Sequence, residues 1–318
     1  MRVVQSRNFA DRYPVKMTCR FAASRLHFSH PATDMNDAQD SGIRNISDTA
    51  LWVAIYRARE SERPDAHFHD PYARRLAGER GEKIAAEMQK KMSIEWPMIA
   101  RTVNIDDAVR NAITHGADMV INLAAGLDSR PYRLDLPAEI KWVEVDLPDM
   151  VDYKEQALAG EIPKCKLERV KLDLRDVEAR RALFARLNNE CSHALIISEG
   201  LLVYLEQSDV AALAEDLTAQ PSFREWVIDL ANPALLKMMK KTYNTLDDAD
   251  ASMKFAPAEG PDFFNQFGWR ATEIHSALHS AAKLKRLPFL YRLFAFLPDS
   301  KGRNPRQVWG GVVRLERT

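Results

Sequence analysis

The stretch INLAAGLDSRPYRL, from Ile121 to Leu134, is the part of the sequence that best indicates the fold. Its first residues are apolar, as in a buried strand, and they run into a turn at Gly126, where the backbone can approach a ligand closely. The stretch has one glycine, and Pro131 stands where a dinucleotide-binding fold has a helix under way. A loop without GxGxxG, in which Pro131 delays the helix, is poorly built to hold a pyrophosphate at a helix N-terminus.

Short β-rich runs recur after Asp118 and alternate with helical or loop stretches: DMVINL, KWVEVD, LERVKLD, ALIISE and EWVIDL. This alternation is typical of βαβ units, in which helices cover both faces of a parallel sheet. Near the C-terminus, QVWGGVVRLER predicts a final strand that could run antiparallel, and FGWRATEI predicts another short strand. The sequence therefore predicts an α/β fold with a mostly parallel, twisted sheet.

The region before the sheet, residues 35–115, has a helical pattern. SDTALWVAIYRARE predicts a helix with Ser47 or Asp48 as its N-cap, and Gly116 ends the last helix of the region. One face of the first helix carries apolar residues at helical spacing. These are Leu51, Ala54, Ile55 and Ala58.

Composition describes an ordinary globular protein. Of 318 residues, 46% are hydrophobic and 28% charged, and Lys plus Arg equals Asp plus Glu at 45 each, so the bulk charge points neither to nucleic acid nor to an anionic membrane. No apolar run reaches the ~18–20 residues needed to span a bilayer. The three cysteines, Cys19, Cys165 and Cys191, form no CxxC and are expected to be reduced thiols of a cytoplasmic protein.

Residues 1–34 differ from the rest because they are rich in arginine and lack the apolar segment of a secretory signal. We expect them to be a disordered N-terminal arm, or an upstream extension of a chain whose translation starts at Met35. An organelle transit peptide is an alternative. Residues 35–318 are expected to form a single domain.

Acidic residues stand at the ends of the predicted strands, namely Asp146, Asp173 and Glu199. Ligands of doubly wound sheets bind beyond the carboxyl ends of the strands, and Asp146, twenty residues after Gly126, has the offset of an acid that bonds a ribose diol. A set of acids favours a cation over an anion. The site thus calls for a ligand that has a ribose without a phosphate chain and that carries a positive charge. S-adenosylmethionine meets both requirements, because it is a nucleoside with a sulfonium charge and no phosphate.

Four motifs, NLAAGLDSRPYRL, WVEVDLPDMVDYK, KLDLRD and ISEGLLVYL, resemble in order and spacing the leucine carboxyl methyltransferase family. That family includes protein carboxyl methyltransferases and bacterial small-molecule O-methyltransferases. The resemblance spans roughly Ser47 to Leu230 and implies a Rossmann-like class I methyltransferase that uses S-adenosyl-L-methionine. Residues 35–115 would then be a helical lid and substrate region, and residues 116–318 the cofactor-binding core.

The resemblance also implies roles for individual residues around the ribose and methionine. Arg101, in IARTVN, matches the arginine that pairs with the methionine carboxylate, where a fork of donors suits a carboxylate. Gly126 matches the glycine beside the methionine moiety, and Asp146 the acid on the ribose hydroxyls. Without the resemblance, Arg101 could be a solvated helix residue and Asp146 a surface acid.

For the adenine, Asp173 and Leu174 match the pair that would supply a carboxylate for the exocyclic amine and a backbone N–H for a ring nitrogen. Glu199 matches an acid close to the cofactor. The alternatives are a helix N-cap for Asp173 and a structural acid for Glu199.

One position departs from the family pattern. The family loop usually reads Gly-Ala-Gly, but this chain has Ala124 at the first position, and alanine disfavours positive φ. That departure puts cofactor affinity in question. The next residues, Asp128, Ser129 and Arg130, follow the family pattern and are expected to hold the loop.

No residue near the motifs is an obvious general base; Tyr204 and His193 are weak candidates. Methyl transfer to a carboxylate needs no base, whereas transfer to a hydroxyl would be helped by one. We therefore expect a small-molecule acceptor with a carboxylate or an acidic hydroxyl. A protein C-terminal carboxylate and a catalytically inactive binding protein remain alternatives, and the oligomeric state is open.

Other motifs are expected to be structural. His275 and His279 have the i, i+4 spacing of a metal pair on one helix face, but HSALH lacks the glutamate of HExxH, so no metal site is predicted. His67 and His69 are likewise expected to be structural, and no GxSxG is present. The lid residues Trp52, Tyr56, Trp96 and Met98 could line an acceptor pocket or form core.

Overall fold

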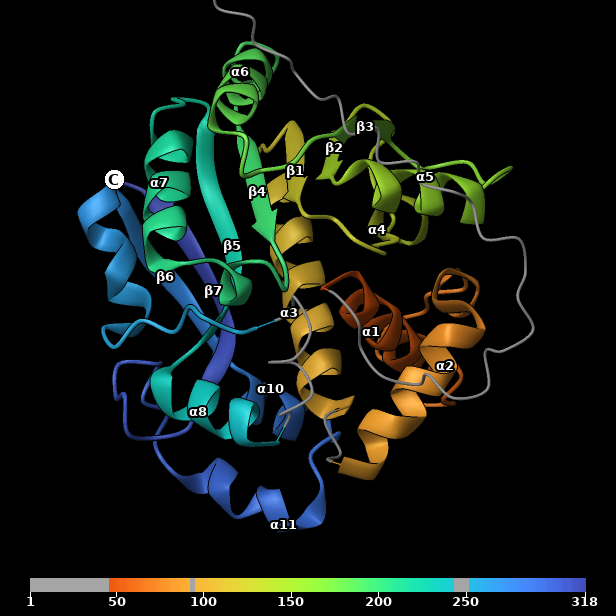
Figure 1. Ribbon diagram of the computed structural model, residues 1–318, viewed down its shortest axis with the longest axis vertical. Helices are drawn as coiled ribbons and strands as arrows, with labels where there is room; N and C mark the ends of the chain where they lie inside the picture. Colours follow the sequence, from red (N-terminus) through yellow and green to blue (C-terminus); the bar gives the residue numbers. More distant parts are fainter. Residues whose placement is uncertain (1–45, 92–94, 243–251) are drawn as a thin grey trace, which may run out of the picture. The chain divides into compact units, whose positions relative to one another are not determined.

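A computed structural model describes residues 46–91, 95–242 and 252–318 (Figure 1). Within these ranges seven strands form one sheet in the order β3-β2-β1-β4-β5-β7-β6. The strands are β1 Met119–Leu123, β2 Lys141–Asp146, β3 Lys166–Lys171, β4 Ala194–Ser198, β5 Phe223–Ala231, β6 Trp269–Ser276 and β7 Gly310–Arg317.

The strands run as the sequence predicts. β1 to β5 are parallel, and β7 is antiparallel to both β5 and β6. Every residue of β1 and β4 is buried, as expected for central strands covered on both faces. The predicted α/β fold with a mostly parallel sheet is therefore confirmed.

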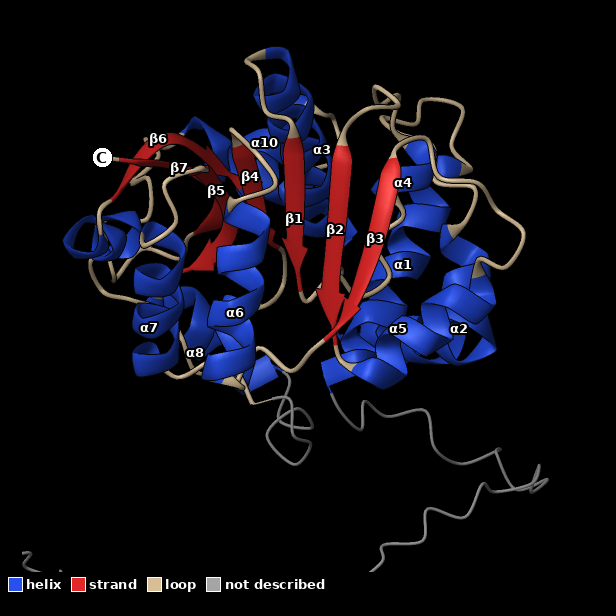
Figure 2. Ribbon diagram, turned by 90° about the horizontal axis from the view of Figure 1, so that it is seen from above, coloured by secondary structure: helices blue, strands red, loops and turns tan. Residues whose placement is uncertain are grey.

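Helices cover both faces of the sheet (Figure 2). On one face, α6 (Val177–Asn188) and α7 (Gln207–Thr218) pack through Phe184 and Leu213 against inward residues of β1 and β4. On the other face, α3 (Glu95–Thr114) packs through Ile105 and Val109 against Trp142 and its neighbours. Since α3 leads directly into the amino end of β1, its last residues lie near that edge of the sheet, and residues of its first half, such as Arg101, lie near the carboxyl ends of the strands.

The helical region before the sheet contains α1 (Ile46–Ser61) and α2 (Ala73–Lys91). The predicted N-cap is wrong, because α1 begins at Ile46 and Asp48 lies inside its first turn, where it accepts hydrogen bonds from Arg80 of α2 at 2.8 and 2.6 Å. The predicted apolar face is confirmed: Ala54 and Ile55 are fully buried.

Further short elements connect the strands along the chain. They are α4 Arg130–Arg133, α5 Pro148–Ala157, η1 Leu202–Tyr204, α8 Pro233–Thr242, η2 Gly260–Phe267, α10 Ala277–Lys283, α11 Phe289–Arg292 and η3 Phe294–Phe296. Figure 1 shows α8, α10 and α11 at one end of the sheet.

The predictions for residues 1–34 and Met35 lie outside the described residues. Of the helices in the described ranges, none combines the length and the apolar character needed to cross a membrane.

Candidate functional site

A cavity of about 1550 Å³ opens at the carboxyl ends of the parallel strands. All six predicted cofactor-binding residues and the candidate base Tyr204 line it: Arg101, Gly126, Asp146, Asp173, Leu174, Glu199 and Tyr204. The sheet brings them together because its parallel strands end at the same edge. The cavity is larger than the ~300–1,000 Å³ of a typical small-molecule pocket, so it has room for two ligands.

The loop after β1 has an unusual backbone. Ala124 has φ 52° and Gly126 has φ 47°, so both are left-handed. That conformation is ordinary for glycine and costs alanine about 1–2 kcal/mol. The helix is delayed, as predicted from Pro131: α4 begins only at Arg130, four residues after Gly126, has Pro131 in its first turn, and is a single turn of four residues.

Arg130 is the buried anchor of this loop, with 2% of its side chain exposed. Its Nη1 donates to Asp128 Oδ2 and to Glu199 Oε2, both at 2.8 Å, and its Nε donates to Asp106 Oδ1 of α3 at 2.7 Å. Burial alone would raise the pKa of Asp128, but the Arg130 guanidinium and nearby cations bring that pKa down to about 2. The expectation that Asp128 and Arg130 hold the loop agrees with these contacts.

Arg101 reaches from α3 to two acids at the strand ends. Its Nη1 donates to Asp229 Oδ2 at 2.9 Å, and its Nε lies 3.0 Å from Glu199 Oε1 as an ion pair without hydrogen-bond geometry. Asp229 also accepts from the backbone N–H of Gly200 at 2.7 Å. Arg101 is therefore a buried, paired residue and not a solvated one, and among the described residues its Nη2 has no hydrogen-bond partner.

Glu199 is held between two guanidiniums. Burial by itself would raise the pKa of its carboxyl group, but the charges of Arg130 and Arg101 lower it below the usual range. The residue is thus ionised at neutral pH and lines the cavity.

Asp146 ends β2 and faces the loop after β1. Its Oδ2 accepts from the N–H of Gly126 at 2.6 Å and its Oδ1 from the N–H of Leu147 at 2.7 Å. Burial raises the pKa of Asp146, and the two backbone bonds only partly oppose that rise. The carboxylate therefore fixes the position of Gly126 and also borders the cavity.

Asp173 and Leu174 follow β3 at the cavity wall. The Asp173 carboxylate accepts from Arg175, at 2.6 Å for Nη2, and this pairing lowers the pKa of Asp173. The alternative of Asp173 as a helix N-cap is wrong, because Asp176 is the N-cap of α6 and accepts from the N–H of Ala179. The carboxylate of Asp173 is thus not committed to a helix terminus.

The two candidate bases are placed at opposite edges of the sheet. His193 precedes β4 at its amino end and contacts Glu225 Oε1 at 2.8 Å, so the structure does not bring it to the cavity. Tyr204 lines the cavity, but burial raises the pKa of its phenol. A phenol that stays protonated can donate a hydrogen bond to an acceptor, and it is a poor base at neutral pH.

The histidine pairs do not form metal sites. His275 lies on β6 and His279 on α10, so they do not share a helix face. His67 contacts Leu284 O and His69 contacts Ser61 O. Within the described ranges no group of three or more His, Cys, Asp or Glu could hold a metal ion.

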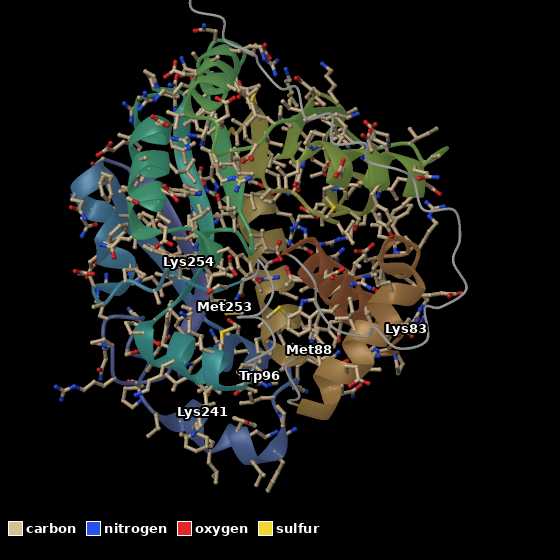
Figure 3. The ribbon with its side chains drawn as sticks, viewed as in Figure 1. Lys83, Met88, Trp96, Lys241, Met253 and Lys254 are labelled. Atoms are coloured by element: carbon tan, nitrogen blue, oxygen red, sulfur yellow. The ribbon has the colours of Figure 1, made fainter. Side chains whose placement is uncertain are left out.

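The expected lid residues divide into two sets. Trp96 and Met98 line the cavity, and Tyr56, which is 2% exposed, belongs to the core between α1 and α2. Trp52 does both, because it lines the cavity and is also a buried member of that core. Burial raises the pKa of Tyr56 to about 12. Trp96 of α3 and Met253, which lies before η2, both line the cavity and come from different segments of the chain (Figure 3).

Sequence reasoning missed two acids. Asp229 lies inside β5, before its last residues, and Asp106 lies on α3 among residues that read as an ordinary amphipathic helix. Both are part of one buried ionic cluster, which consists of Arg57, Arg101, Arg130, Arg133, Asp70, Asp106, Asp128, Glu199 and Asp229. With four arginines against five acids, the formal charge of this ionic cluster is −1.

Comparison with known proteins agrees with this architecture. The family profile described as leucine carboxyl methyltransferase matches residues 50–218. A protein of Parafrankia sp. (strain EAN1pec), named as a candidate S-adenosyl-L-methionine-dependent methyltransferase, is 32% identical over 267 residues, covering 78% of this chain and 84% of the relative.

Two solved structures share the fold. A DUF574 family protein from Streptomyces avermitilis MA-4680 superposes with a TM-score of 0.56 at 12% identity, covering 85% of this chain and 97% of that one. A candidate methyltransferase from Thermobifida fusca YX gives a TM-score of 0.53 at 15% identity, covering 88% and 97%.

The sheet, the acid-lined cavity at its carboxyl edge and the profile match define a class I methyltransferase. The chain belongs to the leucine carboxyl methyltransferase family and is an S-adenosylmethionine-dependent methyltransferase.

Proposed function

We propose that this methyltransferase transfers the methyl group to a carboxylate or an acidic hydroxyl of a small molecule with a substantial apolar part. The observation that carries the proposal is the division of the cavity. One end is bordered by the ionic cluster and Asp146, and the other by apolar side chains from the lid and from α8, α10 and α11.

The residues at the polar end fit the cofactor. The formal charge of −1 on the ionic cluster complements the net +1 of S-adenosylmethionine, which carries a sulfonium, an ammonium and one carboxylate. We assign the methionine carboxylate to Arg101 and the space beside Gly126 to the methionine chain. The assignment of Arg101 is supported by its Nη2, which has no partner among the described residues.

The nucleoside would lie along the ends of β2 and β3. Asp146 would accept from the ribose hydroxyls, with Gly126 held in place by the same carboxylate. Asp173 and the backbone N–H of Leu174 would contact the adenine, and Asp173 would keep or exchange its Arg175 contact when the exocyclic amine arrives. Glu199 would place negative charge near the sulfonium end of the cofactor.

The acceptor would occupy the apolar end, next to Trp52, Met98 and Trp96. An acceptor oxygen attacks the methyl carbon with its lone pair, the carbon–sulfur bond breaks, and its electron pair stays on sulfur to give S-adenosylhomocysteine. A carboxylate is already ionised at neutral pH, so alignment of the three atoms supplies most of the catalysis. Tyr204, whose phenol stays protonated, would orient the acceptor by donating a hydrogen bond.

The acceptor class can be tested in two stages. Isothermal titration with S-adenosylmethionine, and separately with NAD, should show micromolar binding of the first alone. The enzyme is then incubated with labelled cofactor and panels of apolar carboxylic acids, phenols and C-terminal peptides. Methyl transfer to the acids, with label released as methanol by alkali, would support a methyl ester product, whereas alkali-stable label would indicate a hydroxyl acceptor.

Other results would overturn the proposal. Methylation of the peptides alone would make the chain a protein C-terminal carboxyl methyltransferase. Failure to bind the cofactor would indicate an inactive relative, an alternative to which the left-handed Ala124 gives some support. We also propose a cytoplasmic location, which the free thiols of Cys165 and Cys191 support.

A further inference from the structure

A short segment near the C-terminus exposes an unusual amount of apolar surface. The exposed fraction ranges from 72% to 86% for Phe289 and Leu290 of α11, Leu293 between α11 and η3, and Phe296 of η3. Single exposed apolar residues are normal, but a contiguous set marks an interaction surface. We call these four residues the apolar rim.

The apolar rim continues into the cavity. Tyr291, Phe294 and Leu297, which alternate with the rim residues along the chain, line the cavity that also contains the strand-end acids. Met238 and Met239 of α8 line the same cavity. A ligand or a surface that meets the rim therefore lies next to side chains that line the apolar part of the cavity.

The segment that carries the rim is basic although the whole chain has a formal charge of zero. Between Ile274 and Pro298 the sequence has Lys283, Lys285, Arg286 and Arg292 and no Asp or Glu, but Arg286 is paired with Glu60 and Asp65, so three cations remain to flank the rim. Lys283, Lys285 and Arg292 are exposed. The lysines of α8 include Lys241, which lies toward the same end of the molecule (Figures 1 and 3).

We infer that the apolar rim and its basic flanks dock on an anionic lipid surface. Aromatic and leucine side chains beside lysine and arginine are the combination that binds peripheral proteins to such surfaces, where the apolar groups enter the headgroup boundary and the cations stay above it. A second copy of the chain would not be favoured by the charge, because two such flanks would repel each other. The zero bulk charge conceals this local pattern.

The experiment is vesicle flotation of the full chain with phosphatidylcholine vesicles, with and without phosphatidylglycerol. The chain is expected to float with the anionic vesicles and much less with the neutral ones, and added salt should weaken binding. The triple variant Phe289→Ser/Leu293→Ser/Phe296→Ser should bind at least about tenfold more weakly. Lys283→Glu/Lys285→Glu should abolish the preference for anionic vesicles.

Ile162→Ser is the matched control, because Ile162 is 84% exposed and lies between α5 and β3, in a part of the chain remote in sequence from the rim. This variant should float like the parent chain. The rim residues of the triple variant do not line the cavity, so cofactor titration should confirm that all variants are folded. That titration also separates failure of the docking inference from loss of the folded, cofactor-binding state.

Two outcomes would overturn the inference. One is that the parent chain floats with neither type of vesicle, or that it floats no better than the triple variant. The other is that sedimentation velocity shows a dimer which the triple variant dissociates, without any vesicle binding. The rim would then be a contact between copies of the chain.

Discussion

Replacing Ala124 with glycine is expected to stabilise the protein, although glycine usually destabilises a folded chain. Ala124 has φ 52° in the loop that follows β1. In that region the Cβ of an L-residue comes too close to the following carbonyl oxygen, which costs about 1–2 kcal/mol. Glycine has no Cβ and would adopt the same backbone without this cost.

The gain is partly offset by the unfolded chain. Glycine loses more backbone entropy on folding than alanine, by about 0.5–1 kcal/mol. The net stabilisation from Ala124→Gly is therefore expected to reach about 1 kcal/mol, which for a chain of this size corresponds to a rise in Tm of about 1–3 °C. Thermal unfolding followed by circular dichroism can resolve this difference.

Ala125→Gly provides the matched control. Ala125 is buried and does not have a positive φ. This variant therefore loses more backbone entropy on folding and lacks a buried methyl group, and it relieves no strain. It should lower Tm, and so should Gly126→Ala, which would put a Cβ at φ 47°. If Ala124→Gly lowers Tm as much as Ala125→Gly does, the strain assigned to Ala124 is absent.

Three further results are expected at the site. Asp146→Ala should weaken S-adenosylmethionine binding by about 10- to 100-fold in calorimetry, through loss of charge-assisted hydrogen bonds worth ~1.5–3 kcal/mol, and unchanged affinity would refute the ribose assignment. Because the pKa of Asp146 is raised, affinity should begin to fall at a higher pH on acidification than for an ordinary aspartate. Arg130→Met should lower the free energy of unfolding, measured by urea denaturation, by about 3–5 kcal/mol, because it leaves Asp106, Asp128 and Glu199 without their shared cation. A loss below about 1 kcal/mol would contradict this account. The pKa of Asp128 in the folded chain is about 2, below its value in the unfolded chain. Ionised Asp128 should therefore contribute about 2 kcal/mol of stability at a pH above the unfolded pKa, and this contribution should be lost as the pH falls from about 4 to 2. Asp128→Asn should lack this pH dependence.

The strands and their acidic ends could be predicted because they are local features. A parallel strand covered on both faces needs an apolar run, and the polar residue that ends the run, such as Asp146, must face the carboxyl edge. His193 shows the limit of this reasoning. It adjoins β4 in the sequence but at the amino end of the strand, so the direction of the strand separates it from the cavity.

Asp229 and Asp106 could not be identified from their own segments. Asp229 matters because β5 pairs with β4, which brings it beside Gly200, and sheet order is a property of the whole chain. Asp106 is followed by Asp107 on α3, and the helical pattern alone does not show which of the two meets Arg130. Both positions depend on tertiary contacts that hydrophobic periodicity does not encode.

The two ends of the cavity are built by different interactions, and this explains why the sequence indicated the cofactor but not the acceptor. At the end that we propose for the cofactor, the ionic cluster joins α3, the loop after β1, the residue after β4 and β5 through buried charges. Removing one partner of such a group strands another charge in the interior, so few residue types can replace it, and the resulting pattern can be recognised. At the end that we propose for the acceptor, the walls include apolar side chains such as Met98, Met239 and Phe294. Apolar residues of similar size substitute for one another at small cost, so many sequences can build a similar wall and no motif records what it binds.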